Sequence, residues 1–408
     1  NKTAPINYNI NFSLGNKFQL FKKDLGFFIA VNHNRDFQNY QNASINTYIN
    51  LNQEALFPYQ SLSENRSVEN GQLGALANLA YKLSNNHTIT FNVLYNNDAE
   101  IFAREQSGGY TGQVSDTRAI FNVKSMEFIQ RQTVSPQLFS KHIFPKLKNA
   151  ELELAASYTA SKQDEPGLRY FAYSTVIDSV YFDANGNPLE TPLLDTVYSI
   201  QNSEYQYPFQ FVRQLKDQQY QAKADFTLPI GKTGINKIKM GVYFSSLNRD
   251  FREYRFQSTP SPGLPLSSGF TTYNGNFDKF FSSENYGIID TQFNASGEAI
   301  RYIPGYYYVN NTIPRNFYTG KQTVFAGYAM GIFNITKNLK VVGGLRTEYT
   351  LMQATSQDTS LPISNSKFLD FLPSLNFIYS INSKMNIRLS GSRTIVRPNL
   401  REIAPFEQ

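Results

Sequence analysis

The sequence predicts an all-β fold in which antiparallel strands form a transmembrane barrel of the outer-membrane type. Three observations predict this fold class. Apolar and polar residues alternate in many segments, few charges occur together with many aromatic residues, and short and long connections alternate between the segments.

The alternation is strictest at residues 6–14, which read INYNINFSL. Apolar side chains occupy Ile6, Tyr8, Ile10, Phe12 and Leu14, with Asn or Ser between them. A period of two indicates a strand with one apolar and one polar face. The pattern recurs at 73–83, 89–95, 152–158, 220–228, 238–244, 375–381 and 387–389. We expect about 12 such strands along the chain.

The composition suits strands that lie between lipid and water. Charged residues make up 17% of the 408 residues, compared with about 25% in soluble domains. There are 33 Phe and 27 Tyr but no Trp, and no apolar run approaches the roughly 18 residues of a membrane helix. The absence of Cys excludes disulfides and thiolate metal sites. The net charge of +6 is scattered rather than gathered in a stripe for nucleic acid.

Connection lengths indicate a barrel with two different ends. Short turns are expected at 15–24, 85–87, 141–150, 230–237, 335–338 and 382–386. Long loops are expected at about 36–70, 97–118, 162–210, 250–316 and 353–367. Short periplasmic turns and long extracellular loops are typical of outer-membrane barrels. We therefore expect residues 1–408 to form one partial barrel without a separate plug domain. Within 162–210, Asn185-Gly186 predicts a hairpin turn.

Two C-terminal stretches carry a family resemblance. They are KQTVFAGYAMGIFNITKNLKVVGGLRTEYT and LPSLNFIYSINSKMNIRLSGSRTIVRPNLREIAPF, in which GGLRTEYT, LPSLN and RPNLREIAPF are the most specific parts. They resemble the barrel of TonB-dependent outer-membrane receptors of the Bacteroidetes type. The resemblance implies a barrel of about 22 strands closed by a plug, with an energy-coupling box near the N-terminus. We find neither plug nor box in this sequence. We expect either further chain or another chain to close the sheet, because open backbone groups in lipid cost several kcal/mol each.

The resemblance also implies a location and partners. The protein is expected in a Gram-negative outer membrane, taking up a scarce siderophore, glycan or peptide. Its implied partners are outer-membrane lipid and lipopolysaccharide, a TonB-type energy-coupling complex, and a surface lipoprotein or other outer-membrane proteins. No cofactor is implied.

Charged residues in the last strands are candidates for the barrel lumen. In KVVGGLRTEYTLM, Leu345 and Tyr349 share one phase, while Arg346 and Glu348 share the other. A cation on the lipid face costs about 2–4 kcal/mol at the midplane, so Arg346 and Glu348 are expected to face inward. Arg388 is inward by the same argument. The resemblance implies that Glu348 contacts a plug; the alternative is solvated lumen lining.

Three consecutive tyrosines in a long loop are candidates for substrate capture. Tyr306, Tyr307 and Tyr308 occur in YIPGYYYVNNTIP. Tyrosine combines a large stacking face with a polar tip. The alternative is that these rings pack within the loop or lie at the headgroup level.

We expect no enzyme, catalytic residue or metal site. The three histidines are His33, His87 and His142, and we expect them at opposite ends of the barrel, where they cannot converge. Two other functions stay open. One is a passive or structural barrel, either porin-like or an assembly platform, without energy coupling. The other is a soluble all-β adhesin.

Overall fold

The computed structural model describes residues 3–50, 55–111, 118–182, 187–200, 208–231, 234–260 and 273–404. The strands are β1 (Tyr8–Leu20), β2 (Lys23–Asn50), β3 (Leu56–Ser84), β4 (His87–Tyr110), β5 (Ile120–Phe144), β6 (Ala150–Phe182), β7 (Pro188–Ile200), β8 (Phe209–Ile230), β9 (Asn236–Pro260), β10 (Ile288–Phe293), β11 (Ala299–Pro304), β12 (Tyr306–Asn310), β13 (Tyr318–Asn334), β14 (Leu339–Ser356), β15 (Ser364–Ser380) and β16 (Asn386–Ser392). The short helices are α1 (Phe277–Phe280) and α2 (Leu400–Ile403), with 3-10 turns η1 (Pro145–Leu147), η2 (Ser283–Asn285) and η3 (Pro314–Asn316).

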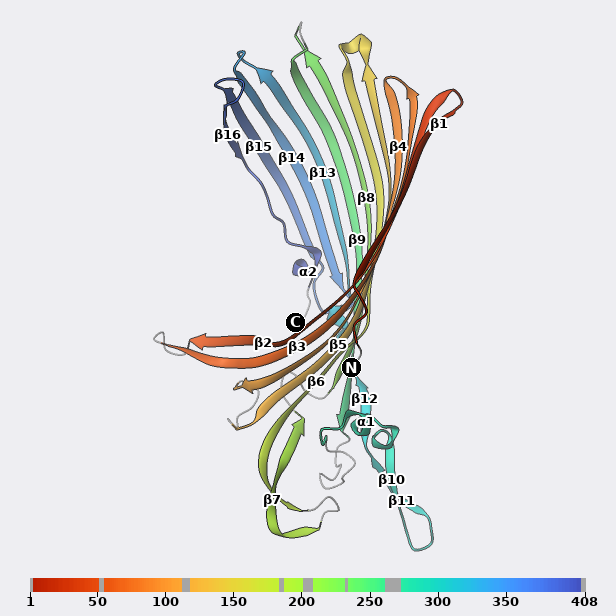
Figure 1. The fold of residues 1–408 in the computed structure, drawn as a ribbon, viewed down its shortest axis with the longest axis vertical. Coiled ribbons are helices and arrows are strands. Elements are labelled where there is room, and N and C mark those ends of the chain that lie inside the picture. Colours follow the sequence, from red (N-terminus) through yellow and green to blue (C-terminus); the bar gives the residue numbers. More distant parts are fainter. Residues whose placement is uncertain are drawn as a thin grey trace.

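One antiparallel sheet of 14 strands makes up most of the molecule (Figure 1). Its continuous path is β1-β2-β3-β4-β5-β6-β8-β9-β13-β14-β15-β16, while β7 pairs with β6 and β12 pairs with β9. The path has the predicted number of strands, and each strand pairs with its neighbour in the chain wherever a short turn joins them. Strands β10 and β11 form a separate hairpin. Within the described residues the sheet is open, since β1 pairs only with β2 and β16 only with β15.

The short turns lie together at the upper end of Figure 1. The β1–β2 turn consists of Phe21 and Lys22, both in the left-handed region with φ of 51° and 59°. Two residues of this kind fit the tight hairpin turn that matches the twist of the strands. The longer connections lie at the opposite end, with β7, β10 and β11.

The strands continue far beyond the length that a bilayer requires. A tilted spanning strand needs about 9–11 residues, whereas β3 has 29 residues and β6 has 33. Much of what the sequence suggests as loops at 36–70 and 97–118 is therefore paired strand in β2, β3 and β4. Strands β6 and β7 also pair on both sides of the expected turn at Asn185-Gly186, which itself lies outside the described residues.

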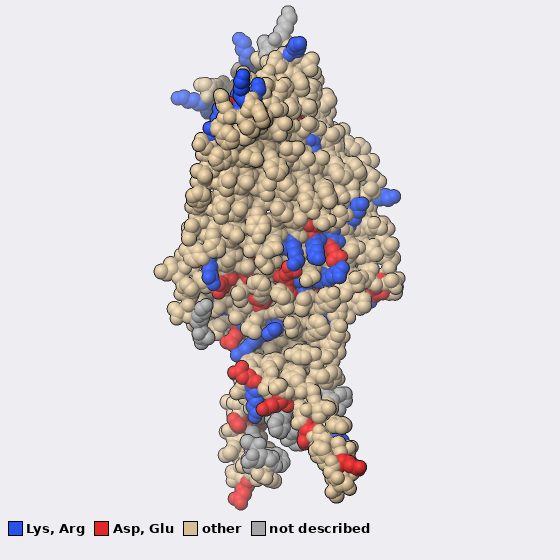
Figure 2. Space-filling view, turned by 90° about the vertical axis from the view of Figure 1, so that its right-hand side faces the viewer, with Lys and Arg blue, Asp and Glu red and all other residues tan. Residues whose placement is uncertain are grey.

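One face of the sheet carries exposed apolar side chains near the short turns. Its members are Ile10, Phe12, Leu14, Ile29, Val31, Leu79, Phe91, Tyr95, Leu138, Leu154, Tyr220, Val242, Phe325, Leu345, Tyr349, Leu375 and Phe377. We call this surface the apolar belt and the face that carries it the outer face. Figure 2 shows a broad surface without charges below the upper end, followed by a band of Lys, Arg, Asp and Glu.

No helix in the described part of the chain is both long enough and apolar enough to cross a membrane.

Candidate functional site

Strand β14 separates lipid-type and polar side chains by its alternation. Leu345 and Tyr349 lie on the outer face and are 46% and 39% exposed. Arg346 and Glu348 lie on the opposite face, which we call the inner face, and their side chains form an ion pair at 2.8 Å. The arrangement keeps both charges away from the apolar belt.

The ion pair on β14 extends to Arg397, which comes from the segment after β16. Glu348 lies directly opposite Asp370 of β15. Two carboxylates in this position repel each other. Arg397 binds both of them, contacting Glu348 and donating to Asp370 at 2.7 Å. Its forked guanidinium can contact two carboxylates at once, and it therefore fixes the returning segment to the inner wall.

A second contact fixes the same segment. Asn399 caps α2 and forms a capping box with Glu402, which satisfies backbone donors at the start of the helix. Leu400 is 3% exposed and rests on Gly320 of β13, where an added Cβ would come within 3.0 Å of the leucine. Gly320 thus leaves room for Leu400, and α2 packs against the inner face of β13 and β14.

Arg388 also shares the inner phase, opposite Ile378, but it does not join this cluster. Its side chain is exposed and donates to Asn386 at 3.0 Å. The structure therefore brings Arg346 and Glu348 together and leaves Arg388 apart. Sequence reasoning did not single out Arg397 or Asp370 for this site, although RPNLREIAPF, which contains Arg397, stood out as a motif.

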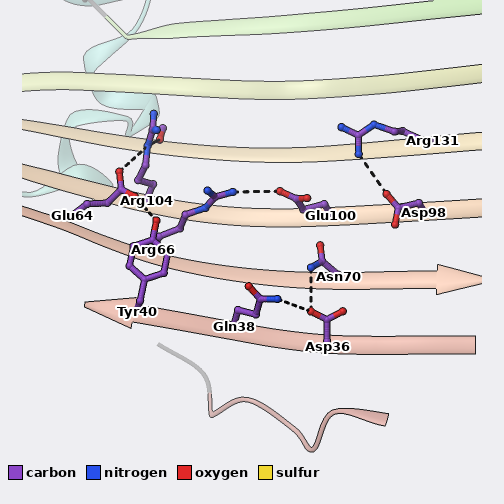
Figure 3. Close-up of polar contacts among 11 residues, drawn as sticks. Asp36, Gln38, Tyr40, Glu64, Arg66, Asn70, Asp98, Glu100, Arg104 and Arg131 are labelled. Carbon is purple, nitrogen blue, oxygen red and sulfur yellow. Dashed lines mark hydrogen bonds and ion pairs between the residues drawn. The ribbon is translucent and has the colours of Figure 1, made fainter. Parts of the chain in front are cut away.

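Polar contacts continue across the inner face of β2 to β5 (Figure 3). Glu64 of β3 is only 5% exposed and accepts a hydrogen bond from Tyr40 of β2. That hydrogen bond raises the pKa of Tyr40. Arg66 pairs with Glu100 at 3.5 Å. Further contacts in the figure are Arg104–Glu64, Arg131–Asp98, Asn70–Asp36 and Gln38–Asp36.

The inner face of β6, β8 and β9 repeats this arrangement with deeper burial. Arg213 of β8 lies between Glu165 and Glu253, at 3.5 Å and 2.5 Å. The two carboxylate side chains are 8% and 6% exposed. Asn316 donates to Glu253 at 2.8 Å, which ties η3 to the wall. The inner face is therefore lined by paired charges over most of the sheet.

A cluster of aromatic rings lies on the strand extensions beyond the membrane-length part of the sheet. It contains Phe171, Tyr173, Tyr198, Tyr273, Phe277, Phe280, Tyr286 and Tyr306. Phe280 is 3% and Tyr306 4% exposed, with ring centroids 5.0 Å apart. Burial raises the pKa of Tyr286. The rings hold the segment around α1 against β6 and β12.

A cleft of about 500 Å³ lies beside this aromatic cluster. Its lining includes Phe171, Phe209, Phe277, Phe281 and Tyr308, together with the cations Lys124 and Arg169. The Lys124 ammonium lies 4.6 Å from the centre of the Phe277 ring and 2.9 Å from a carboxylate oxygen of Glu105. Aromatic faces with a few oriented charges are typical of ligand pockets.

The three candidate tyrosines take different positions around the cleft. Tyr308 lines it, is 61% exposed, and stacks on Tyr286 at 5.3 Å. Tyr306 is buried in the aromatic cluster, where it packs rather than binds. Tyr307 is 41% exposed and is not part of the cleft lining. Phe281 follows Phe280 in the same long loop as the candidate tyrosines, whereas nothing in the sequence pattern indicated Lys124 for this cleft.

The histidines differ from the sequence expectation. His87 and His142 are direct cross-strand neighbours, with their Nδ1 atoms 3.0 Å apart. The expectation that the histidines cannot converge is wrong for this pair, because the two short turns that carry them are adjacent. His33 lies elsewhere, against Tyr8 and the carbonyl of Gln72. No group of three or more potential metal ligands occurs among the residues that the structure describes.

Comparison with known proteins identifies the class of the chain. The model of the "Outer membrane protein beta-barrel family" matches residues 285–408. The protein is an outer-membrane β-barrel protein. Its sheet of antiparallel strands, exposed apolar belt and polar inner face agree with a location in the outer membrane. No curated protein matches the chain.

Proposed function

We propose that this outer-membrane barrel is a receptor and transporter that captures a scarce substrate outside the cell and passes it to the periplasm. The substrate would be a siderophore, a glycan or a peptide. The observation that carries the proposal is the aromatic cleft, which lies on the strand extensions at the end opposite the short turns. In such barrels the end with longer connections is extracellular, so the cleft would face the substrate first.

The inner wall supports the transport part of the proposal. A lumen lined by ion pairs is hydrated and can hold a polar plug or let a polar substrate pass. A TonB-type energy-coupling complex would supply the energy, as the resemblance of GGLRTEYT and RPNLREIAPF implies. Lipopolysaccharide and a surface lipoprotein are the further partners proposed. No catalytic step is part of this function.

The cleft gives a direct test of substrate capture. Binding of ferric enterobactin, maltohexaose and a hexapeptide would be measured on cells that display the full-length protein. If one probe binds, Phe281→Ala and Tyr308→Ala should weaken it by about 10-fold, the usual effect of losing a stacking ring. Tyr302→Ala is the matched control, because Tyr302 of β11 is 60% exposed and lies outside the cleft. Equal losses in all three variants would refute capture at the cleft.

The polar inner wall would equally suit a passive, porin-like barrel or a structural barrel. A protonophore separates these functions, because energised transport stops when the inner membrane is depolarised whereas diffusion through an open lumen continues. Accumulation of the bound probe in the periplasm should fall to the level of a deletion strain after treatment. Accumulation that persists at an unchanged rate would favour the passive barrel.

A further inference from the structure

The outer face carries a row of charged side chains at the far border of the apolar belt. Its members are Arg35, Glu69, Lys162, Asp164, Lys216, Asp250, Arg252, Lys321 and Lys367. We call this row the charged band. It is independent of the lumen and of the aromatic cleft. The inference drawn from it rests on the lipopolysaccharide contact of the proposed function and assigns that contact a site.

A pocket with a volume of about 470 Å³ lies in the band, on strands β8, β9, β13 and β14. Four cationic residues line it, namely Lys216, Arg249, Arg252 and Lys321. The guanidinium of Arg249 is paired with Asp217 on the inner face, which leaves Lys216, Arg252 and Lys321 for the outer face. Asp250 also lines the pocket and accepts a hydrogen bond from Arg252 at 3.0 Å. Lys216 and Lys321 are exposed and form no ion pair among the described residues, so the pocket has an excess of positive charge.

The height of this pocket matches the headgroup region of a membrane. Lys321 lies 13 positions before Asn334, the last residue of β13 at the short-turn end. Strands rise about 3.3 Å per residue and tilt by about 40° in such barrels, so this separation corresponds to roughly 33 Å along the membrane normal. The apolar band of an outer-membrane barrel is about 25 Å tall. The lysines therefore lie just beyond the outer-leaflet acyl chains.

A groove in the apolar belt lies on the same four strands, closer to the short turns. It has a volume of about 600 Å³ and is lined by Ala222, Ala224, Gly327 and the rings of Phe244, Phe325 and Tyr349. Three small residues on the outer face create the depression between the rings. Phe325 lies four positions from Lys321 along β13, so the groove reaches toward the basic pocket in the direction that an acyl chain takes from its headgroup.

We propose that this pocket and groove bind a phosphorylated glycolipid of the outer leaflet, with its phosphate among Lys216, Arg252 and Lys321 and an acyl chain in the groove. The positive charge favours the anionic headgroup. The apolar surface favours the chain, and the separation of the two fits one amphiphile across the membrane border. Clustered Lys and Arg beside a membrane surface bind anionic headgroups in this way.

The test is native mass spectrometry of the full-length protein in detergent, titrated with diphosphorylated lipid A. The double variant Lys216→Gln/Lys321→Gln should weaken binding by about 10-fold or more, since each cation near an anionic lipid surface contributes substantially. The matched control is Lys337→Gln/Lys384→Gln, which removes two exposed lysines from short turns at the other end. The control should bind as the wild type does.

Two further measurements separate a lipid from a free anion. Gly327→Leu should fill the groove and weaken lipid A binding. The position tolerates a side chain, because an added Cβ would meet only the backbone oxygen of Gly241, at 4.0 Å. Inorganic phosphate should not displace lipid A. The proposal would be overturned by unchanged binding in the lysine variant or in Gly327→Leu. Displacement by inorganic phosphate or equal binding of dephosphorylated lipid A would also overturn it. The heat-dependent gel mobility of folded barrels verifies that each variant is folded.

Discussion

The two halves of the long strands use the same backbone pairing in different surroundings. Near the short turns, the outer face presents an exposed apolar belt, and strands alternate between apolar and polar residues. Toward the other end, the same strands continue with polar side chains on both faces, and a cluster of aromatic rings packs on part of them. Apolar and polar residues therefore alternate where one face of the sheet meets lipid. Backbone hydrogen bonding between the strands does not depend on lipid and continues beyond it. Four predictions test this division, beginning with the largest expected effect.

Phe280→Ala should detach the aromatic cluster from the strand extensions without affecting the barrel. The ring is 3% exposed and contacts Phe171 and Tyr306, and loss of a buried Phe costs about 3–5 kcal/mol. Hydrogen–deuterium exchange should increase at 273–310 and stay unchanged in β13 and β14. Ile300→Ala, at a side chain 63% exposed in β11, is the control. If the amides of residues 273–310 exchange equally slowly in both variants, the aromatic cluster does not hold this segment on the strand extensions.

Leu345→Arg tests the apolar belt directly. Leu345 lies six positions from the start of β14 on the outer face, so the arginine would enter the middle of the bilayer at a cost of about 2–4 kcal/mol. Ile101→Arg places the same side chain on the outer face of β4, at a position 50% exposed beyond the belt. Only the first variant should have a lower free energy of unfolding, measured in lipid vesicles. A similar loss in Ile101→Arg would extend the belt into the second region.

The limits of sequence reasoning follow from the same division. The strands expected at 6–14 and 375–381 are present at 8–14 and 375–380, because lipid on one face enforces a period of two. Residues 56–70 show no such period, since both of their faces meet water, and they were therefore expected to be loop although they pair throughout with β2. The contact between Arg397 and Glu348 could not be predicted, because it joins residues 49 positions apart through a segment that returns along the inner wall.

Arg397→Met should loosen that segment. Removing the guanidinium leaves Glu348 and Asp370 opposite each other, and breaking a buried pair costs 3–5 kcal/mol; with side chains still 12% and 21% exposed, we expect about 2 kcal/mol. Trypsin should then cleave more rapidly at Arg401. Arg393→Met is the control, because Arg393 is exposed in the same segment. The prediction fails if the two variants are cleaved at the same rate.

Arg35→Gln should have the smallest effect, although Arg35 also forms an ion pair on a strand. Its partner is Glu69, and both side chains are partly exposed, at 41% and 31%. A pair of this kind contributes about 0–1 kcal/mol in water, so the unfolding midpoint in denaturant should hardly change. The measurement is informative because Arg35 belongs to the charged band at the border of the belt. If lipid reached this height, the neutral variant would leave Glu69 as an uncompensated charge in an apolar medium and would be destabilised as strongly as Arg397→Met. That outcome would move the border outward and require the basic pocket of Lys216 and Lys321 to lie within the acyl chains rather than among the headgroups.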